Sequence, residues 1–273
     1  MSQIRKPAVA GYFYPADPSK LKSEIEYLLS AAEKKEVSGR LYGIVSPHAG
    51  YTYSGKTAAF GFKLLDKKNI KTVIIISPSH REYFPGVSVY EGDAYRTPLG
   101  EVPVNKKAAD TLASNAKTIF KGMEGHREEH AIEVQIPFLQ TVLDDFEIVP
   151  LVMGDQGKLY IDELTERLKD TVDEKTLVVS SSDLSHYYPG DVADRMDSLV
   201  ERDINLFNYE GLYENFEKRR CEACGAGTII ALMKSADKLK FNKSVVLHRS
   251  DSGDTTGNKN EVVGYLSAAV YGE

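Results

Sequence analysis

Short, continuous apolar runs recur along this chain. They lie at residues 41–46, 72–77, 146–154 and 176–182, and they are rich in valine and isoleucine. Such runs, bounded by turn residues, are typical of strands that are buried on both faces. The third run contains Pro150, which lacks an amide hydrogen and therefore favours an edge strand or a bulge. Two more apolar runs, at residues 244–251 and 262–272, predict a final pair of strands.

Segments with a helical period separate these strands. They lie at residues 56–68, 130–143, 160–172 and 227–239, and Pro137 predicts a kink in the second. Strands that alternate with helices predict a three-layer α/β/α sandwich with a central mixed, mostly parallel sheet. The last two strands would add an antiparallel pair at its edge. Because no linker and no repeat interrupts the pattern, we expect residues 1–273 to form a single domain.

Composition and charge limit the class of function. The 273 residues are 42% hydrophobic and 27% charged, which is ordinary for a soluble globular protein. The net charge of −6 and a pI near 5.6 indicate no basic surface for nucleic acid. No apolar run approaches the ~20 residues of a membrane helix, and the N-terminus has no signal-peptide core. We therefore expect a cytoplasmic protein with neither nucleic-acid nor membrane partners.

Three of the six histidines follow predicted strands by a few residues. These are His48, His80 and His186, and the runs before them end in small residues, mainly serine. The ligand crevice of an open α/β sheet lies beyond the carboxyl ends of its strands, so we expect the three imidazoles in one crevice. Neutral imidazole is a common ligand of zinc, iron and copper. The pattern therefore indicates a metal site.

The chain has two cysteines, Cys221 and Cys224, in one C-x-x-C motif. We prefer Cys224 as the third ligand, because a helix start favours a thiolate and Gly225 and Gly227 permit close approach. A structural zinc site would need a second cysteine pair or nearby histidines. A thioredoxin-like pair would be expected after an early strand. Two reduced thiols without a role are the other alternative.

Three further polar residues are candidates for the crevice. Asp183 could hydrogen-bond a ligand histidine and select its tautomer, or it could cap the turn in which it lies. His130 and Glu133 are three residues apart in a predicted helix and would share one face. They would reach the pocket and bind substrate, or they would form an ordinary pair on the helix surface.

Tyr51 and Arg81 are candidates for substrate binding on weaker grounds. Tyr51 lies three residues after His48 and could line the pocket, although buried tyrosines are common in loops. Arg81 follows His80 directly and could bind an anionic substrate. A surface salt bridge is the alternative for Arg81.

Seven motifs carry a resemblance to a known family: KPAVAGYFYP, PHAGYTYSG, SPSH, YRTPLG, EHAIEVQIPFLQ, SSDLSHYYP and CGAGTI. In this order, from Lys6 to about Ile229, they resemble the Memo-like family. Its archaeal and bacterial members are often labelled AmmeMemoRadiSam system protein B. The family's fold is similar to that of the class III, LigB-type extradiol dioxygenases. This agrees with the sandwich that the apolar pattern predicts.

The resemblance also implies roles for individual residues. His48, His80 and Cys224 match the metal ligands of the family, and His186 matches the acid–base histidine of the dioxygenases. The family label implies a pathway link to a radical-SAM enzyme. The dioxygenases hold iron with two histidines and a carboxylate, whereas this chain has a softer, oxidisable cysteine in that place. Such a set would bind one ion of iron, zinc or copper.

Two classes of function stay open at this stage. In the first, the chain is a metalloenzyme in which His186 moves a proton, with Asp183 beside it. Fold analogy favours dioxygenase-like oxidoreductase chemistry, and the ligand set favours hydrolysis. In the second class, the chain is a non-catalytic metal-binding or peptide-binding adaptor. The ligand of the crevice would accordingly be a small molecule or a peptide.

Overall fold

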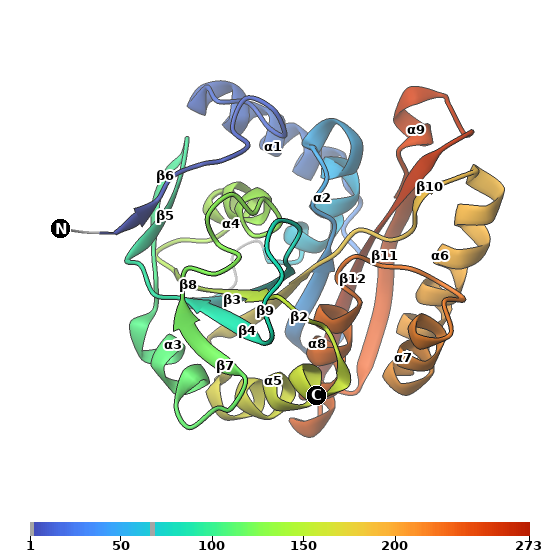
Figure 1. Cartoon of the computed structure of the whole chain (residues 1–273). Helices are drawn as coiled ribbons and strands as arrows, with labels where there is room; N and C mark the ends of the chain where they lie inside the picture. The colour runs from blue at the N-terminus through green and yellow to red at the C-terminus, as the bar shows by residue number, and fades with distance from the viewer. Residues whose placement is uncertain (1–2, 66–68) are drawn as a thin grey trace.

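A single large sheet organises the molecule. The structure is a computed structural model that describes residues 3–65 and 69–273. Within them, nine strands form the main sheet in the order β10-β12-β2-β9-β3-β8-β4-β7, with β11 also paired to β12 (Figure 1). The strands are β2 (Arg40–Ser46), β3 (Thr72–Pro78), β4 (Val87–Tyr90), β7 (Ile119–Gly122), β8 (Glu147–Met153), β9 (Thr176–Ser181), β10 (His186–Tyr188), β11 (Lys243–Asp251) and β12 (Val262–Gly272).

The centre of this sheet is parallel, and on each side it meets an antiparallel neighbour. Strands β2, β9, β3 and β8 run in one direction, while β12 is antiparallel to β2 and β4 is antiparallel to β8. Strand β11 pairs with β12 in the antiparallel sense, as the sequence predicts for the last two strands. The mixed sheet of an α/β/α sandwich is thereby confirmed.

Pro150 lies in a strand with neighbours on both sides, so of its two predicted positions, an edge strand or a bulge, the edge strand is wrong. It pairs with Ile75 of β3, and on the other side β4 contacts only residues 151–153 of β8. The next contact on that side is a bridge from Val104 to Ile148. Pro150 therefore lies at a break between two partners, where a missing amide hydrogen is tolerated.

Helices cover both faces of the sheet (Figure 1). Residues of α1 (Pro18–Ala31), α2 (Lys56–Lys63) and α4 (Ile136–Val142) belong to one hydrophobic cluster. The other cluster includes residues of α3 (Lys106–Ala113), α5 (Lys158–Thr171), α6 (Gly190–Asn205), α7 (Tyr209–Glu217) and α8 (Ala226–Lys238). A short helix, α9 (Gly253–Thr256), follows β11. Among the described residues, no helix has the length and apolar character needed to cross a bilayer.

Two predicted helices differ from the structure. The helix expected at 56–68 ends at Lys63, and residues 66–68 lie outside the described residues. The helix expected at 130–143 begins only at Ile136, after a 3₁₀ turn, η2 (Glu133–Gln135), and His130 lies in the preceding loop. Pro137 thus lies in the first turn of α4, where its missing amide hydrogen is not needed, and the predicted kink is wrong.

A small second sheet holds the N-terminal segment. Strand β1 (Ile4–Arg5) is parallel to β5 (Ala94–Thr97), which pairs with β6 (Gly100–Pro103). Arg5 in β1 is buried, and its Nε donates to the carbonyl oxygen of His126 at 3.1 Å. The same guanidinium donates to the Glu129 carbonyl and to the Glu133 carboxylate. One arginine therefore holds both ends of the loop at residues 126–133.

Glu133 is fully buried, and its carboxylate accepts hydrogen bonds from the N-terminal segment. Besides Arg5, the donors are the main-chain amides of Ala8 at 2.8 Å and Val9 at 3.0 Å, and the Tyr14 hydroxyl. These donors occupy both carboxylate oxygens. In this structure Glu133 therefore anchors the N-terminal segment.

This anchor predicts a large effect on stability. The substitution Glu133→Gln leaves the buried Arg5 guanidinium without its counter-charge, so the free energy of unfolding should fall by about 3–5 kcal/mol. Urea unfolding followed by circular dichroism measures this change.

The matched control is Arg96→Gln. Arg96 pairs with Glu101 on the surface, where both side chains are more than two-fifths exposed, and such pairs contribute about 0–1 kcal/mol. Equal losses for the two variants would contradict an anchoring role for Glu133.

Candidate metal centre

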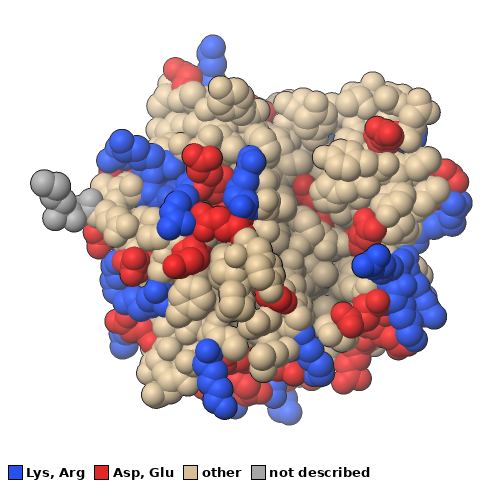
Figure 2. All heavy atoms as spheres, in the orientation of Figure 1, with Lys and Arg blue, Asp and Glu red and all other residues tan. Residues whose placement is uncertain are grey.

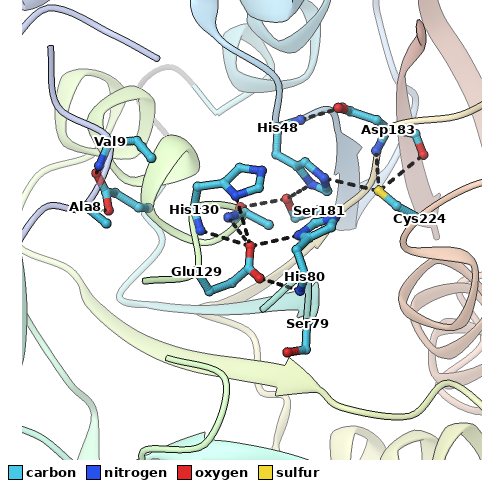
Figure 3. A network of polar contacts seen from close by, with 12 residues as sticks. Ala8, Val9, His48, Ser79, His80, Glu129, His130, Ser181, Asp183 and Cys224 are labelled. Carbon is cyan, nitrogen blue, oxygen red and sulfur yellow. Dashed lines mark hydrogen bonds and ion pairs between the residues drawn. The ribbon is translucent and has the colours of Figure 1, made fainter. Parts of the chain in front are cut away.

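Three adjacent parallel strands end together at one edge of the sheet. Ser46 at the end of β2 pairs with Ser181 at the end of β9, and Ser180 of β9 pairs with Ile76 of β3. The loops that leave this edge carry His48, His80 and Asp183 into one region (Figure 3). The register of the strands therefore brings together residues that are distant in the sequence.

His48, His80 and Cys224 form a group that could hold a metal ion. Their nearest donor atoms all lie within 4.8 Å of one another, and Cys224 Sγ is 3.1 Å from His48 Nε2. Metal–ligand bonds of about 2.0–2.3 Å place the donors of a tetrahedral site roughly 3.3–3.8 Å apart. The group thus needs only small adjustments to surround one ion. Its mixture of one sulfur and two nitrogen donors suits zinc, copper or iron.

His48 is held in the orientation that a ligand needs. Its Nδ1 lies 2.9 Å from Ser181 Oγ, which leaves Nε2 directed at Cys224. Its main-chain amide donates to Asp183 Oδ1 at 2.7 Å. Burial lowers the pKa of His48 to about 3, and the charge of His80 acts in the same direction. The imidazole is therefore neutral near pH 7, which is the form that binds metals.

Glu129 orients His80. One carboxylate oxygen accepts from His80 Nδ1 at 2.9 Å and the other from the His80 main-chain amide at 2.6 Å. The main-chain amides of His130 and Ala131 also donate to this carboxylate. Burial would raise the pKa of Glu129, but the hydrogen bond and charge of His80, with His130, bring it to about 2. An ionised carboxylate on Nδ1 leaves Nε2 of His80 for a metal, as in many histidine-ligated sites.

Cys224 lies just before α8, and its sulfur accepts a hydrogen bond from the Asp183 main-chain amide at 3.2 Å. The expectation that the helix start makes this thiol acidic is wrong. Burial raises the pKa of the Cys224 thiol, and the charge of Asp183 raises it further. A metal would therefore have to displace the thiol proton. Cys221 is buried in the hydrophobic cluster around α8, and burial raises its pKa to about 12.

His130 lies beside the two histidines of the group. Its ring stacks on His80 with centroids 4.9 Å apart, and its centroid is 5.4 Å from that of His48. His130 Nδ1 lies 3.3 Å from Glu129 Oε1, and His80, Glu129 and His130 form a second group of close donors. Because His130 is in a loop, it does not share a helix face with Glu133 as the sequence predicts.

His186 and Asp183 border the group from the side of β10. His186 Nδ1 lies 2.8 Å from the carbonyl oxygen of Leu184, and His186 lines the same cavity as Cys224. Asp183 is buried and accepts from the main-chain amide of His48, whereas the ring of His48 has Ser181 as its partner. Burial raises the pKa of Asp183, against the effect of the His48 amide and of His186.

The other substrate-binding candidates lie away from the donor atoms or on the surface. The Tyr51 hydroxyl donates to the Val134 carbonyl at 2.7 Å, and the ring packs in the core against Phe138. Glu133 binds the N-terminal segment, as described above. Arg81 follows His80 on the exposed surface. Of the four candidates, His130 is the one whose ring contacts His48 and His80.

Sequence reasoning did not single out two partners of the candidate ligands. Glu129 lies beside His130 in the sequence, and Ser181 lies in a run of serines. The contacts that make them important span 49 residues to His80 and 133 residues to His48. Gln135 in turn donates to Ser181 Oγ at 2.8 Å. Polar residues next to a predicted ligand, or at the end of a buried strand, are the signal that could have found these partners.

The sequence matches a known family over nearly its whole length. The sequence profile described as "Memo-like protein" matches residues 5–269. A MEMO1 family protein of Thermoplasma volcanium is 40% identical over 266 residues, which cover 97% of each chain. One of Methanosarcina barkeri is 36% identical over 272 residues, covering 98% of this chain and 100% of the relative.

A solved structure also resembles the chain. It is an uncharacterized protein of Escherichia coli K12, with a TM-score of 0.54 and 14% identity, covering 85% of this chain and 100% of that one. At this identity the likeness concerns the fold alone. The profile match and the relatives cover nearly the whole sequence, and the chain therefore belongs to the Memo-like family.

Proposed function

We propose that this chain is a metal-dependent enzyme that holds one zinc, copper or iron ion through His48, His80 and Cys224. The observation that carries the proposal is the close approach of three donors from separate loops. A different partner orients each donor: Ser181 for His48, Glu129 for His80, and the Asp183 amide for Cys224. Such support from neighbouring groups is typical of sites that bind metals.

An accessible site with three donors is typical of catalytic metal sites and not of structural ones. Structural zinc sites are closed by four protein ligands, whereas catalytic sites use three and keep one position open. In this group His80 is exposed and Cys224 is partly exposed, so a substrate can reach the donors from solvent. An ion bound there would supply Lewis acidity to a substrate or water.

His186 is suited to move a proton at this site. Because Nδ1 faces the Leu184 carbonyl oxygen, Nδ1 carries the hydrogen and Nε2 has a free lone pair. His186 also lines the cavity beside Cys224, where a reacting group would lie. We assign His186 the role of general base and acid.

The donor set favours hydrolysis over dioxygenase chemistry. A thiolate is more readily oxidised than the carboxylate that dioxygenases use, so oxygen chemistry on iron would damage Cys224 itself. A thiolate with two neutral imidazoles is compatible with the three-ligand sites of zinc hydrolases.

The first prediction separates metal binding from proton transfer. His48→Ala removes a donor, and Cys224→Ser replaces a soft sulfur donor by a hard oxygen. Each substitution should weaken zinc binding by at least about 100-fold. His186→Ala should keep the affinity within about threefold while lowering turnover by about 10²–10⁴-fold. Competition with a chelating dye measures affinity, and a screen of esters, phosphoesters and catechols supplies the turnover assay.

The matched control is His248→Ala. This histidine is half-buried between Thr57 and Phe60 and belongs to neither group of close donors. It should bind zinc like the unaltered chain. If His186→Ala lost zinc as completely as His48→Ala, His186 would be a ligand and its assigned role would be wrong.

The second prediction concerns the Cys224 sulfur. Bound zinc should protect Cys224 from iodoacetamide, because coordination occupies the lone pair that attacks the reagent, and a chelator should restore labelling. Cys221 is buried in the core, whereas Cys224 is partly exposed, so Cys221 should stay unlabelled in both states. Mass spectrometry of digested protein measures both sites. Equal labelling of Cys224 with and without zinc would exclude it as a ligand.

The third prediction concerns Glu129. The substitution Glu129→Gln removes the negative charge of the carboxylate that accepts from His80 Nδ1. It should weaken zinc binding by about 10–100-fold. The neighbouring Glu128 is exposed, so Glu128→Gln is the matched control and should change nothing. Unaltered affinity in Glu129→Gln, measured with the same dye, would show that this carboxylate does not support the site.

A further inference from the structure

A cavity of about 400 Å³ lies beside Cys224 of the candidate metal centre. His186 and Cys224 line it together with Leu184, Phe216, Arg219 and Glu222. Pockets that bind small molecules occupy about 300–1,000 Å³ and combine apolar walls with a few polar groups. The cavity is therefore large enough for the part of a substrate that does not react.

Arg219 lies just after the end of α7 and is exposed. Its φ is 51°, in the left-handed region, and its main-chain amide donates to the Phe216 carbonyl at 2.9 Å. Helix ends of this kind favour glycine, because a side chain is unfavourable in that conformation. The chain instead has a long cation there, at the wall of the cavity. Among the described residues, no hydrogen bond or ion pair occupies its guanidinium.

Glu222 is the second charged residue of the cavity wall, and one of its carboxylate oxygens already has a hydrogen-bond donor. One of its carboxylate oxygens accepts a hydrogen bond from the Tyr188 hydroxyl at 2.7 Å. Around the cavity, the neighbouring Arg220 lies 3.5 Å from Asn215 Oδ1 and does not line the wall. On the face that Figure 2 shows, acidic and basic side chains are interspersed around a mostly uncharged centre. An anion would therefore be drawn by a local cation and not by a broad positive field.

We propose that this cavity binds the substrate and that Arg219 binds an anionic group on it, a carboxylate or a phosphate. A guanidinium binds either anion through two parallel hydrogen bonds. Leu184 and Phe216 would contact the organic body, and the reacting bond would lie near His186 and Cys224. The inference rests on the proposed function, since it takes the metal centre as the place of reaction. It assigns to Arg219 the role that the sequence suggested for Arg81.

The test is calorimetric titration of the zinc-loaded chain with benzoate and with phenyl phosphate, which distinguishes the two anions. Benzamide is the uncharged comparison and should not bind measurably. Arg219→Gln should weaken binding of the preferred anion by at least about tenfold, because it removes a charged hydrogen-bond donor. Arg220→Gln, the matched control, should change the affinity by less than about twofold.

A second variant tests the effect of the negative charge in the cavity wall. Glu222→Gln removes a negative charge from the wall, while its amide oxygen still accepts from Tyr188, so anion binding should tighten by about two- to fivefold. A general disturbance of the cavity would weaken binding in both variants. Opposite effects of Arg219→Gln and Glu222→Gln would support electrostatic recognition.

Two results would overturn the inference. One is the absence of saturable binding of either anion to the unaltered chain. The other is equal anion affinity in the unaltered chain and Arg219→Gln, which would mean that the metal alone holds the anion. Zinc content is measured in the same samples. If zinc fails to bind, the proposed function fails, and titration of the metal-free chain still tests Arg219.

Discussion

The hydrogen-bonded register of β2, β9 and β3 determines where the chemistry of this protein can lie. Parallel neighbours must end at the same edge of a sheet, and Ser46 of β2 pairs directly with Ser181 of β9. The loops that follow have little length in which to diverge, and His48 and His80 each lie two residues after the end of a strand. The start of α8 then places Cys224 against the same edge.

A second set of contacts supports these loops. Arg5 binds the loop at residues 126–133 through its carbonyl oxygens and the buried carboxylate of Glu133. From that loop, Glu129 reaches His80 with an ionised carboxylate. The N-terminal strand is therefore connected to His80 through the hydrogen bond from Arg5 to the Glu129 carbonyl oxygen. A disturbance of Arg5 is expected to reach His80 as well as the stability of the fold.

Local sequence patterns were enough to predict the sandwich and the residue types of the site. Apolar runs of strand length alternate with helical periods, and this local information is enough to predict a covered, mixed sheet. Because loops follow the carboxyl ends of strands, His48, His80 and His186 were expected at one edge of the sheet. Motifs around Cys224 supplied the third donor by resemblance to a family. None of these inferences needs a contact between particular side chains.

The division of the polar residues between the site and the scaffold follows from contacts that form in the folded chain. Glu133 was a candidate for substrate binding, but a segment more than a hundred residues away binds its carboxylate. Burial raises the pKa of Cys224, although its place before a helix favours a thiolate. Glu129 and Arg219 gain their importance from a distant imidazole and from a cavity wall. Burial and long-range pairing arise only when the chain is folded, so no local pattern encodes them.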